Sequence, residues 1–162
     1  MSNKLDWINR YWPPFRTNRQ VRPSAIWRAS FLGGLGSCLV PLFFGVLLSA
    51  LAIPFETVPP SAFYSAIGGL GLILVISPLV ALIAVVPALF LAVGALRAGF
   101  AGWVVATGAG AIVATMVFAF AISIQGNPVV VGGIFGSLYG ALFWMCARLS
   151  TPEAFVRPAD VA

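Results

Sequence analysis

Long stretches without charge dominate the pattern of hydrophobic and polar residues along this 162-residue chain. No charged residue occurs from Phe31 to Ile53, from Thr57 to Leu96, or from Ala98 to Ala147. Each stretch is longer than the roughly 20 apolar residues that a helix needs to cross a hydrocarbon layer of about 30 Å. The pattern therefore predicts an all-α integral membrane protein.

The second uncharged stretch is too long for one membrane crossing. It would extend to roughly 60 Å as a single helix at about 1.5 Å per residue, so we assign its first part to a loop and a lead-in. Gln125 to Pro128 form a turn signal that divides the third stretch. The expected transmembrane helices, which form two antiparallel hairpins, are residues 30–53, 66–94, 98–124 and 128–148.

The distribution of charge predicts the orientation of these four helices. With four crossings, all nine Lys and Arg residues fall on one side of the membrane, whereas the loops on the other side carry only Glu56. Positively charged segments stay on the cytoplasmic side. We therefore expect a multi-pass protein of the cytoplasmic (inner) membrane with both termini in the cytoplasm, residues 150–162 forming a cytoplasmic tail.

The N-terminal tail, residues 1–29, is basic and aromatic. Leu5, Ile8 and Trp12 follow a helical spacing that ends at Pro13, which predicts a short helix lying at the interface of the lipid bilayer. In the alternative interpretation the cations only fix the topology. No nucleic-acid-binding module accompanies the charge, so no nucleic-acid partner is expected. The residues expected at the membrane surface are Arg10, Trp12, Arg16, Arg19, Arg22 and Arg28.

Small residues recur at every fourth position in the last two predicted helices. Residues four apart lie on one face of an α-helix. Glycine weakens a helix in water by about 1 kcal/mol relative to alanine, but in a bilayer it lets two helices approach closely. Because the turn between these helices allows only a hairpin, we expect their small faces to pack together. The faces consist of Gly102, Ala106, Gly110 and Ala114 in one helix and Gly132, Gly136 and Gly140 in the other.

Two prolines interrupt the second predicted helix. Pro78 and Pro87 each remove a backbone hydrogen bond and can kink a helix. In one interpretation the freed carbonyl groups, with the hydroxyls of Ser77, Thr107 and Thr115, line a path for a solute. The alternative is an ordinary kinked membrane helix whose neighbours compensate for the lost hydrogen bonds.

The chemistry that the sequence lacks excludes most classes of enzyme. The chain has no histidine, its two cysteines do not form a metal-ligand spacing, and no expected transmembrane helix carries Asp, Glu, Lys or Arg in its interior. Metal centres, hydrolases and proton-coupled transporters depend on such groups, so we expect no enzyme activity, cofactor or metal.

Two functions fit what is left. We expect a non-enzymatic accessory or oligomeric membrane subunit that acts through helix packing, against itself or another membrane protein. The alternative is a passive transporter or channel for a small neutral or anionic solute.

Overall fold

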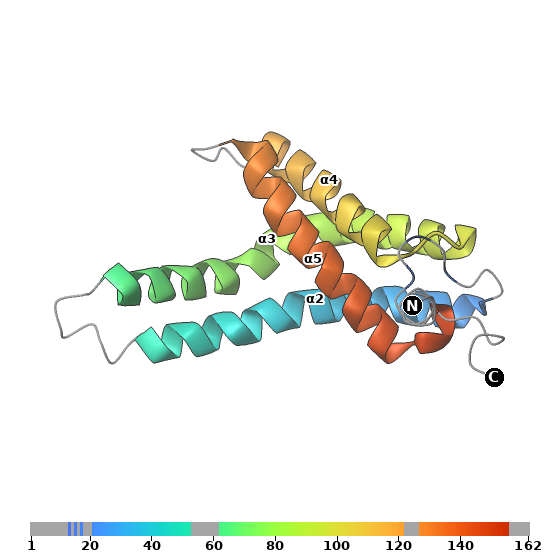
Figure 1. The fold of residues 1–162 in the computed structure, drawn as a ribbon, viewed down its shortest axis with the longest axis horizontal. Helices are drawn as coiled ribbons and strands as arrows, with labels where there is room; N and C mark the ends of the chain where they lie inside the picture. Colours follow the sequence, from blue (N-terminus) through green and yellow to red (C-terminus); the bar gives the residue numbers. More distant parts are fainter. Residues whose placement is uncertain are drawn as a thin grey trace, which may run out of the picture. The chain divides into compact units, whose positions relative to one another are not determined.

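The computed structural model describes Pro13, Phe15, Thr17 and residues 21–52, 62–121 and 127–155. The regular secondary structure of these residues is entirely helical, without a strand, which confirms the predicted all-α class. The predicted interfacial helix falls outside these residues and stays a prediction. The helices, drawn in Figure 1, are α2 (Pro23–Ala52), α3 (Ala62–Ala98), α4 (Trp103–Ala121), α5 (Pro128–Ser150) and the 3-10 helix η2 (Pro152–Ala154).

The chain divides into two compact units. Unit 1 comprises Met1–Ser37 and Ala84–Ala162, and unit 2 comprises Cys38–Ile83. The division falls within α2 and within α3, so each of these helices contributes one part to each unit. Helices α4 and α5 belong to unit 1 over their whole length.

Helix α2 begins seven residues before the predicted start at residue 30. Pro23 occupies its first turn, where a missing N–H costs no helical hydrogen bond. Ala25, Ile26 and Ala29 are buried, whereas Arg28 is exposed. An arginine on the exposed face does not end a helix whose other face is buried, so the helix extends beyond the expected membrane span. Arg28 therefore lies within α2.

A glycine turn separates α3 from α4. Helix α3 extends four residues beyond the predicted span of 66–94 at each end, and Gly99 then adopts a φ of 73°, which glycine adopts without steric cost. The N–H of Gly99 donates to the carbonyl of Leu96 at 3.1 Å, and that of Phe100 to Ala95 at 2.8 Å. This is the Schellman arrangement that ends a helix. As a result α4 begins at Trp103, whereas the expected span began at residue 98.

Helix α5 begins at Pro128, as the sequence predicts. The side chain of Asn127 caps it by accepting a hydrogen bond from the N–H of Val129 at 3.0 Å. At the other end, the hydroxyl of Thr151 donates to the carbonyl oxygen of Ala147 at 2.8 Å. The helix ends at Ser150, two residues beyond the predicted end at residue 148.

In unit 2, the last part of α2 packs antiparallel to the first part of α3. Gly45 lies against Gly71, and a Cβ atom placed on Gly45 would lie 2.7 Å from the backbone nitrogen of Val75. Nearer the loop, a Cβ atom on Gly68 would make an ordinary contact, 3.5 Å from the Cβ atom of Ala52. The two backbones thus come closest around Gly45.

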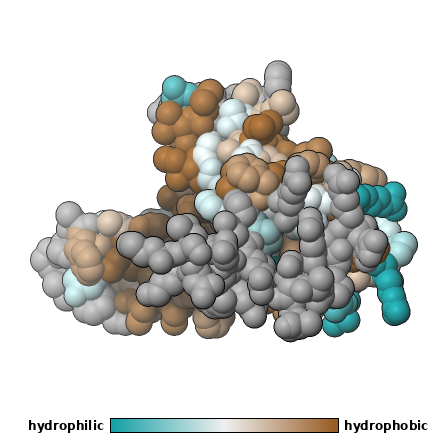
Figure 2. Space-filling view, turned by 45° about the vertical axis from the view of Figure 1, so that its right-hand side comes forward, coloured by the Kyte–Doolittle hydropathy of each residue, from teal (hydrophilic) through white to brown (hydrophobic). Residues whose placement is uncertain are grey.

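Two helices are long and apolar enough to span a membrane, namely Pro23–Ala52 and Val129–Ser150. Shorter apolar stretches occupy Phe63–Leu79, Val86–Ala98 and Trp103–Ala119. Hydrophobic residues cover much of the described surface in the view of Figure 2. These features favour association with a membrane.

Candidate functional site: the two contact regions of helix α5

Helix α5 packs against α4 with no side chains between the two backbones. At the centre of the contact, a Cβ atom on Gly136 would fall on the carbonyl oxygen of Gly110, and one on Gly110 would fall on that of Gly136. One turn later, a Cβ atom on Gly140 would fall on the carbonyl oxygen of Ala106. A larger residue at these glycines requires the backbones to move apart.

The same contact continues for one turn in the other direction. A Cβ atom on Gly132 would lie 2.6 Å from the Cα atom of Thr115. As residue numbers rise along α5, those of its partners in α4 fall, so the two helices are antiparallel. We call this contact the glycine interface, and its small residues are Ala106, Gly110, Ala114, Gly132, Gly136 and Gly140.

Close approach of two backbones replaces side-chain packing along the glycine interface. Carbonyl oxygens there meet backbone atoms of the facing helix, an arrangement in which Cα–H···O contacts each contribute about 0.5–1 kcal/mol. Such contacts offset the low helix propensity of glycine, which costs about 1 kcal/mol per residue relative to alanine in water. The structure thus brings together six of the seven small residues predicted to pack here.

Gly102 is the seventh, and it lies in the turn before α4 instead of on a helix face. Its N–H donates to the carbonyl oxygen of Phe15 at 3.2 Å, and its own carbonyl accepts the N–H of Ala106 at 3.0 Å. Gly102 therefore stands at the N-cap of α4 and is not part of the glycine interface.

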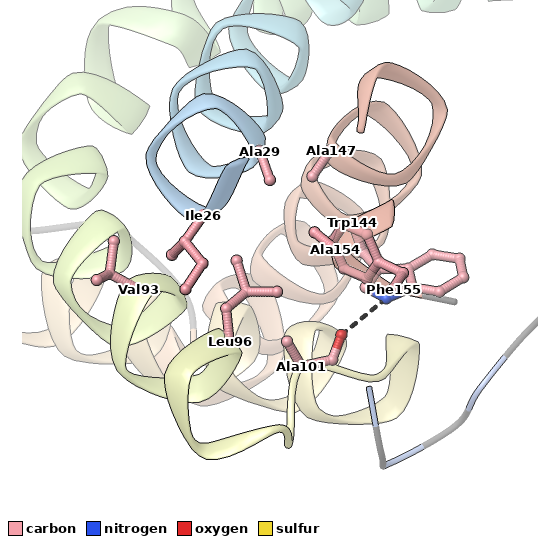
Figure 3. Close-up of a cluster of buried hydrophobic side chains, with 9 residues drawn as sticks. All are labelled: Ile26, Ala29, Val93, Leu96, Ala101, Trp144, Ala147, Ala154 and Phe155. Carbon is pink, nitrogen blue, oxygen red and sulfur yellow. Dashed lines mark hydrogen bonds between the residues drawn. The ribbon is translucent and has the colours of Figure 1, made fainter. Parts of the chain in front are cut away.

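Beyond the glycine interface, the last two turns of α5 join a cluster of buried side chains (Figure 3). Trp144 is only 3 % exposed, and its indole N–H donates to the carbonyl oxygen of Ala101 at 2.9 Å. Ile26 from α2 and Leu96 from α3 pack into the same cluster. We call it the Trp144 cluster, and its members are Ile26, Ala29, Val93, Leu96, Ala101, Trp144, Ala147, Ala154 and Phe155.

The segment after α5 folds back onto Trp144. Phe155 is buried, and its ring meets the indole edge to face, with centroids 5.9 Å apart. The guanidinium carbon of Arg148 lies 5.4 Å from the centre of the Trp144 ring, within the range of a cation–π attraction. Residues 151–155, the start of the expected cytoplasmic tail, thus pack into unit 1.

The N-terminal tail supplies hydrogen-bond acceptors to the start of α4. The first N–H groups of a helix have no partner within it. The N–H of Trp103 donates to the carbonyl oxygen of Pro13 at 3.2 Å, one residue after the bond from Gly102 to Phe15. The tail therefore caps α4 with backbone groups from a distant part of the chain.

Thr17 completes this connection. It is 2 % exposed, and its N–H donates to the carbonyl oxygen of Gly99 at 2.9 Å. Its hydroxyl oxygen accepts the N–H of Ala101 at 3.3 Å. We call Pro13, Phe15 and Thr17 the tail strap, because they tie the N-terminal tail to the turn between α3 and α4.

The first half of α2 meets another face of α5. A Cβ atom on Gly33 would lie 2.9 Å from the Cβ atom of Ala147 and 3.0 Å from the carbonyl oxygen of Phe143. A Cβ atom on Gly36 would lie 2.6 Å from the sulfur of Cys146. Close packing at glycine therefore also joins α2 to the end of α5.

The hydroxyl of Ser77 is bonded within its own helix. It donates to the carbonyl oxygen of Leu74 at 3.0 Å, and this carbonyl lost its usual helical partner because Pro78 has no N–H. Helix α3 continues through both Pro78 and Pro87 without a break. The carbonyl that Pro78 leaves without a helical donor is thus satisfied by the residue next to the proline.

The two predicted threonines lie beside the glycine interface. The hydroxyl of Thr107 donates to the carbonyl oxygen of Trp103, one turn earlier, at 2.6 Å. The backbones of Thr107 and Thr115 approach Gly140 and Gly132, respectively. Both threonines and Pro87 belong to unit 1, whereas Ser77 and Pro78 belong to unit 2.

The structure describes two of the six residues predicted at the membrane surface. Arg22 and Arg28 are both exposed. The carbonyl oxygen of Arg22 accepts the N–H groups of Ala25 and Ile26 at the start of α2. The other four, which lie outside the described residues, are Arg10, Trp12, Arg16 and Arg19.

Neither metal chemistry nor similarity to a known protein defines the site. Within the described residues, no group of three or more His, Cys, Asp or Glu side chains is placed to hold a metal ion. No protein-family model, curated protein or solved structure matches the chain. The geometry of the contacts is therefore the basis for the functional proposal.

Sequence reasoning missed the tail strap and the Trp144 cluster. None of the sequence patterns described above involves Trp144 or Thr17. The one local clue was Gly99, because a glycine directly after a helix that carries a basic residue in its last turn, here Arg97, is typical of a helix stop.

Proposed function

We propose that this chain is a small multi-pass protein of the cytoplasmic membrane in which α2, α3, α4 and α5 each cross the bilayer. The distribution of apolar side chains carries this proposal. Among the described residues, thirty large hydrophobic side chains are exposed, against ten hydrophobic residues that are buried. So many exposed large apolar side chains are rare on a water-soluble monomer, whereas the hydrocarbon of a bilayer solvates them.

The packing of unit 1 suits the same environment. In lipid, the hydrophobic effect does not drive helices together, and close packing at small residues takes its place. The glycine interface is packing of this kind. Helix α4, with 19 residues, is about 28 Å long at 1.5 Å per residue, which matches a hydrocarbon layer of about 30 Å.

The arginines support an orientation with both termini in the cytoplasm. Helices α2 and α4 begin, and α3 and α5 end, at the Trp144 cluster. Arg97 and Arg148 lie in the last turns of α3 and α5. Since basic residues concentrate on the cytoplasmic side, we assign this end of unit 1 to the cytoplasm.

We propose a non-enzymatic role as an accessory or oligomeric subunit that acts through helix contacts. The glycine interface is occupied within the chain, so a contact with another copy or another membrane protein uses an outer face. On α5, a Cβ atom on Gly133 would meet nothing within 4 Å. Ile134 and Leu138 beside it are both 58 % exposed, which makes this face available for contact.

Membrane extraction combined with topology mapping tests the proposal. The protein is expected to stay in the membrane fraction at alkaline pH and to leave it only in detergent. Reporter fusions at the two ends and between α4 and α5 are expected to place both termini in the cytoplasm and that loop on the opposite side. Extraction at alkaline pH without detergent would contradict the membrane assignment, and termini on opposite sides would contradict four crossings.

Two neighbouring glycines test association. Gly133→Leu is expected to weaken self-association or co-purification of a partner in mild detergent while the protein stays folded. Gly136→Leu is expected to disrupt the fold itself, because its side chain would enter α4. If the Gly133→Leu protein and the unaltered protein form the same assemblies, this face is not the contact.

Passive transport, the alternative function, has less support. The hydroxyls of Ser77 and Thr107 donate to carbonyl oxygens of their own helices, which leaves fewer donors for a solute. Flux across liposomes that contain the purified protein, measured for a panel of ions and small neutral solutes, distinguishes the two functions. Solute flux above that of protein-free liposomes would favour transport.

A further inference from the structure

Exposed arginines gather around the Trp144 cluster. Arg22, Arg28 and Arg97 are exposed, and each is adjacent in sequence to a residue that belongs to this cluster or packs against it. Together with Arg148, they are the only cationic side chains among the described residues, and Glu153 is the only carboxylate among them. This end of unit 1 is therefore strongly basic for a chain of so few charges.

Exposed aromatic side chains lie close in sequence to these arginines. Trp27, which precedes Arg28, is 52 % exposed. On the turn after Arg97, Phe100 is 42 % exposed and Trp103 is 44 % exposed. Aromatic side chains with one apolar and one wet surface concentrate at the level of lipid headgroups, where a phosphate lies within reach of a guanidinium group.

The α3–α4 turn holds its residues in a defined arrangement. The Schellman bonds of Gly99 and Phe100 fix it from one side, and the four hydrogen bonds of the tail strap fix it from the other. The backbone of Arg97, in the last turn of α3, is therefore fixed relative to those of Phe100 and Trp103. Arg148 is already in contact with the Trp144 ring, so we do not count it among the groups free to bind.

We infer that Arg22, Arg28 and Arg97, flanked by Trp27, Phe100 and Trp103, form a binding surface for the phosphate headgroups of anionic phospholipids. The inference rests on the proposed function, since it requires this end of unit 1 to lie at the membrane interface. Guanidinium groups pair with phosphate oxygens through two parallel hydrogen bonds. The neighbouring aromatic side chains contact the start of the acyl chains, which a soluble phosphate lacks.

Lipid binding to the purified full-length protein tests this surface. In mild detergent, phosphatidylglycerol is expected to raise the unfolding temperature and to stay bound in native mass spectrometry, whereas phosphatidylcholine and inorganic phosphate are not. The triple variant Arg22→Gln/Arg28→Gln/Arg97→Gln is expected to lose about tenfold or more in affinity for phosphatidylglycerol. The matched variant with three lysines keeps the charge and is expected to retain part of the affinity.

Several outcomes would overturn the inference. These are equal stabilisation by phosphatidylcholine, full stabilisation by inorganic phosphate alone, or unchanged lipid affinity in the triple glutamine variant. Single variants add a control, because Arg97→Gln is expected to weaken binding more than Lys4→Gln, which removes the same charge near the start of the chain. An equal loss from both would show that total charge, and not this surface, selects the lipid.

Alkaline extraction of the same variants separates this inference from the proposed function. A protein that stays in the membrane but shows no preference for phosphatidylglycerol would overturn the lipid-binding surface and leave the membrane assignment intact. A protein that alkaline buffer removes from the membrane would contradict the proposed function as well.

Discussion

Along its first turns α5 meets α4 through glycines, whereas its last two turns join a cluster filled by Trp144 and its neighbours. The glycine interface involves two helices that follow each other in the chain. The Trp144 cluster gathers residues from α2, α3, the α3–α4 turn and the segment after α5. The first part of α5 is thus held to α4 by backbone contact, and its last turns are held by the side chains of the Trp144 cluster together with the close approach of Gly33 and Gly36 from α2.

This difference has consequences for how each region responds to change. A glycine contact has no side chain that can adopt another rotamer, so an added atom must push two backbones apart. A side-chain cluster can adjust. The decrease in the free energy of unfolding after a substitution there depends on the volume and the hydrogen bonds that are removed. We therefore expect the glycine interface to be the less tolerant of the two regions, and the predictions below test that order.

The largest expected effect comes from Gly136→Leu in the glycine interface. The new side chain would overlap the backbone of α4 at Gly110. We therefore expect the free energy of unfolding to fall by at least about 3 kcal/mol, at the upper end of overpacking effects, or no folded protein to form. Thermal unfolding in mild detergent measures it. Gly133→Leu is the control, since nothing lies within 4 Å of its Cβ position, and equal behaviour of the two variants would contradict the close contact with α4.

A smaller loss is expected from Trp144→Phe in the Trp144 cluster. The variant keeps an aromatic ring but removes the indole N–H, which leaves the buried carbonyl of Ala101 without this donor. The expected cost is about 1–3 kcal/mol, read from the same unfolding measurement. Trp27→Phe, at a position 52 % exposed, should change stability by less than about 0.5 kcal/mol. A loss at Trp144 larger than that of Gly136→Leu would reverse the proposed order of the two regions.

Gly99→Ala tests the turn that brings α4 to both regions. At a φ of 73°, alanine pays a steric cost of about 1–2 kcal/mol. The comparison is Gly94→Ala in α3, where the helix is exposed and nothing lies within 4 Å of the added atom. That substitution should be neutral or stabilise the helix by up to about 1 kcal/mol. Similar unfolding temperatures for the two variants would argue against the left-handed turn.

The smallest expected effect belongs to Thr17→Val in the tail strap. Valine has nearly the same shape but cannot accept the hydrogen bond from the N–H of Ala101, so we expect a loss of about 0.5–1.5 kcal/mol. Hydrogen exchange measured by mass spectrometry should become faster at residues 101–103 and stay unchanged in the glycine interface. Thr17→Ser keeps the acceptor and should behave as the unaltered protein. Faster exchange throughout α4 and α5 would instead mean that the two regions are not separable.

The two regions also differ in how far the sequence predicts them. The helical class and the pairing of α4 with α5 are visible in local patterns, because the glycines repeat every fourth residue and Gln125 to Pro128 allow only a tight turn. Helix α2 begins seven residues before the expected membrane span, because the span was delimited by charge and charge does not end a helix. The sequence alone does not show that Trp27 and Arg28 lie on an exposed face of α2 while the opposite face is buried.

The Trp144 cluster could not be predicted because its contacts are distant in sequence. Thr17 and Ala101 are 84 residues apart, and no periodicity relates them. The sequence leaves two interpretations of Ser77 open, a hydroxyl that lines a path for a solute or a residue of an ordinary kinked helix. In the structure the Ser77 hydroxyl donates a hydrogen bond to the carbonyl oxygen of Leu74, which has no helical donor because of Pro78. The spacing of residues alone does not reveal this local compensation.

The tail strap has a consequence for the order in which the protein is completed during synthesis. Pro13, Phe15 and Thr17 leave the ribosome early, but the N–H groups that donate hydrogen bonds to them belong to residues 101 to 103. The tail strap can therefore form its hydrogen bonds only after α2 and α3 have been synthesised. Residues 13–17 are thus made long before the groups to which they bind, and α4 receives its cap only after its own first residues have been synthesised.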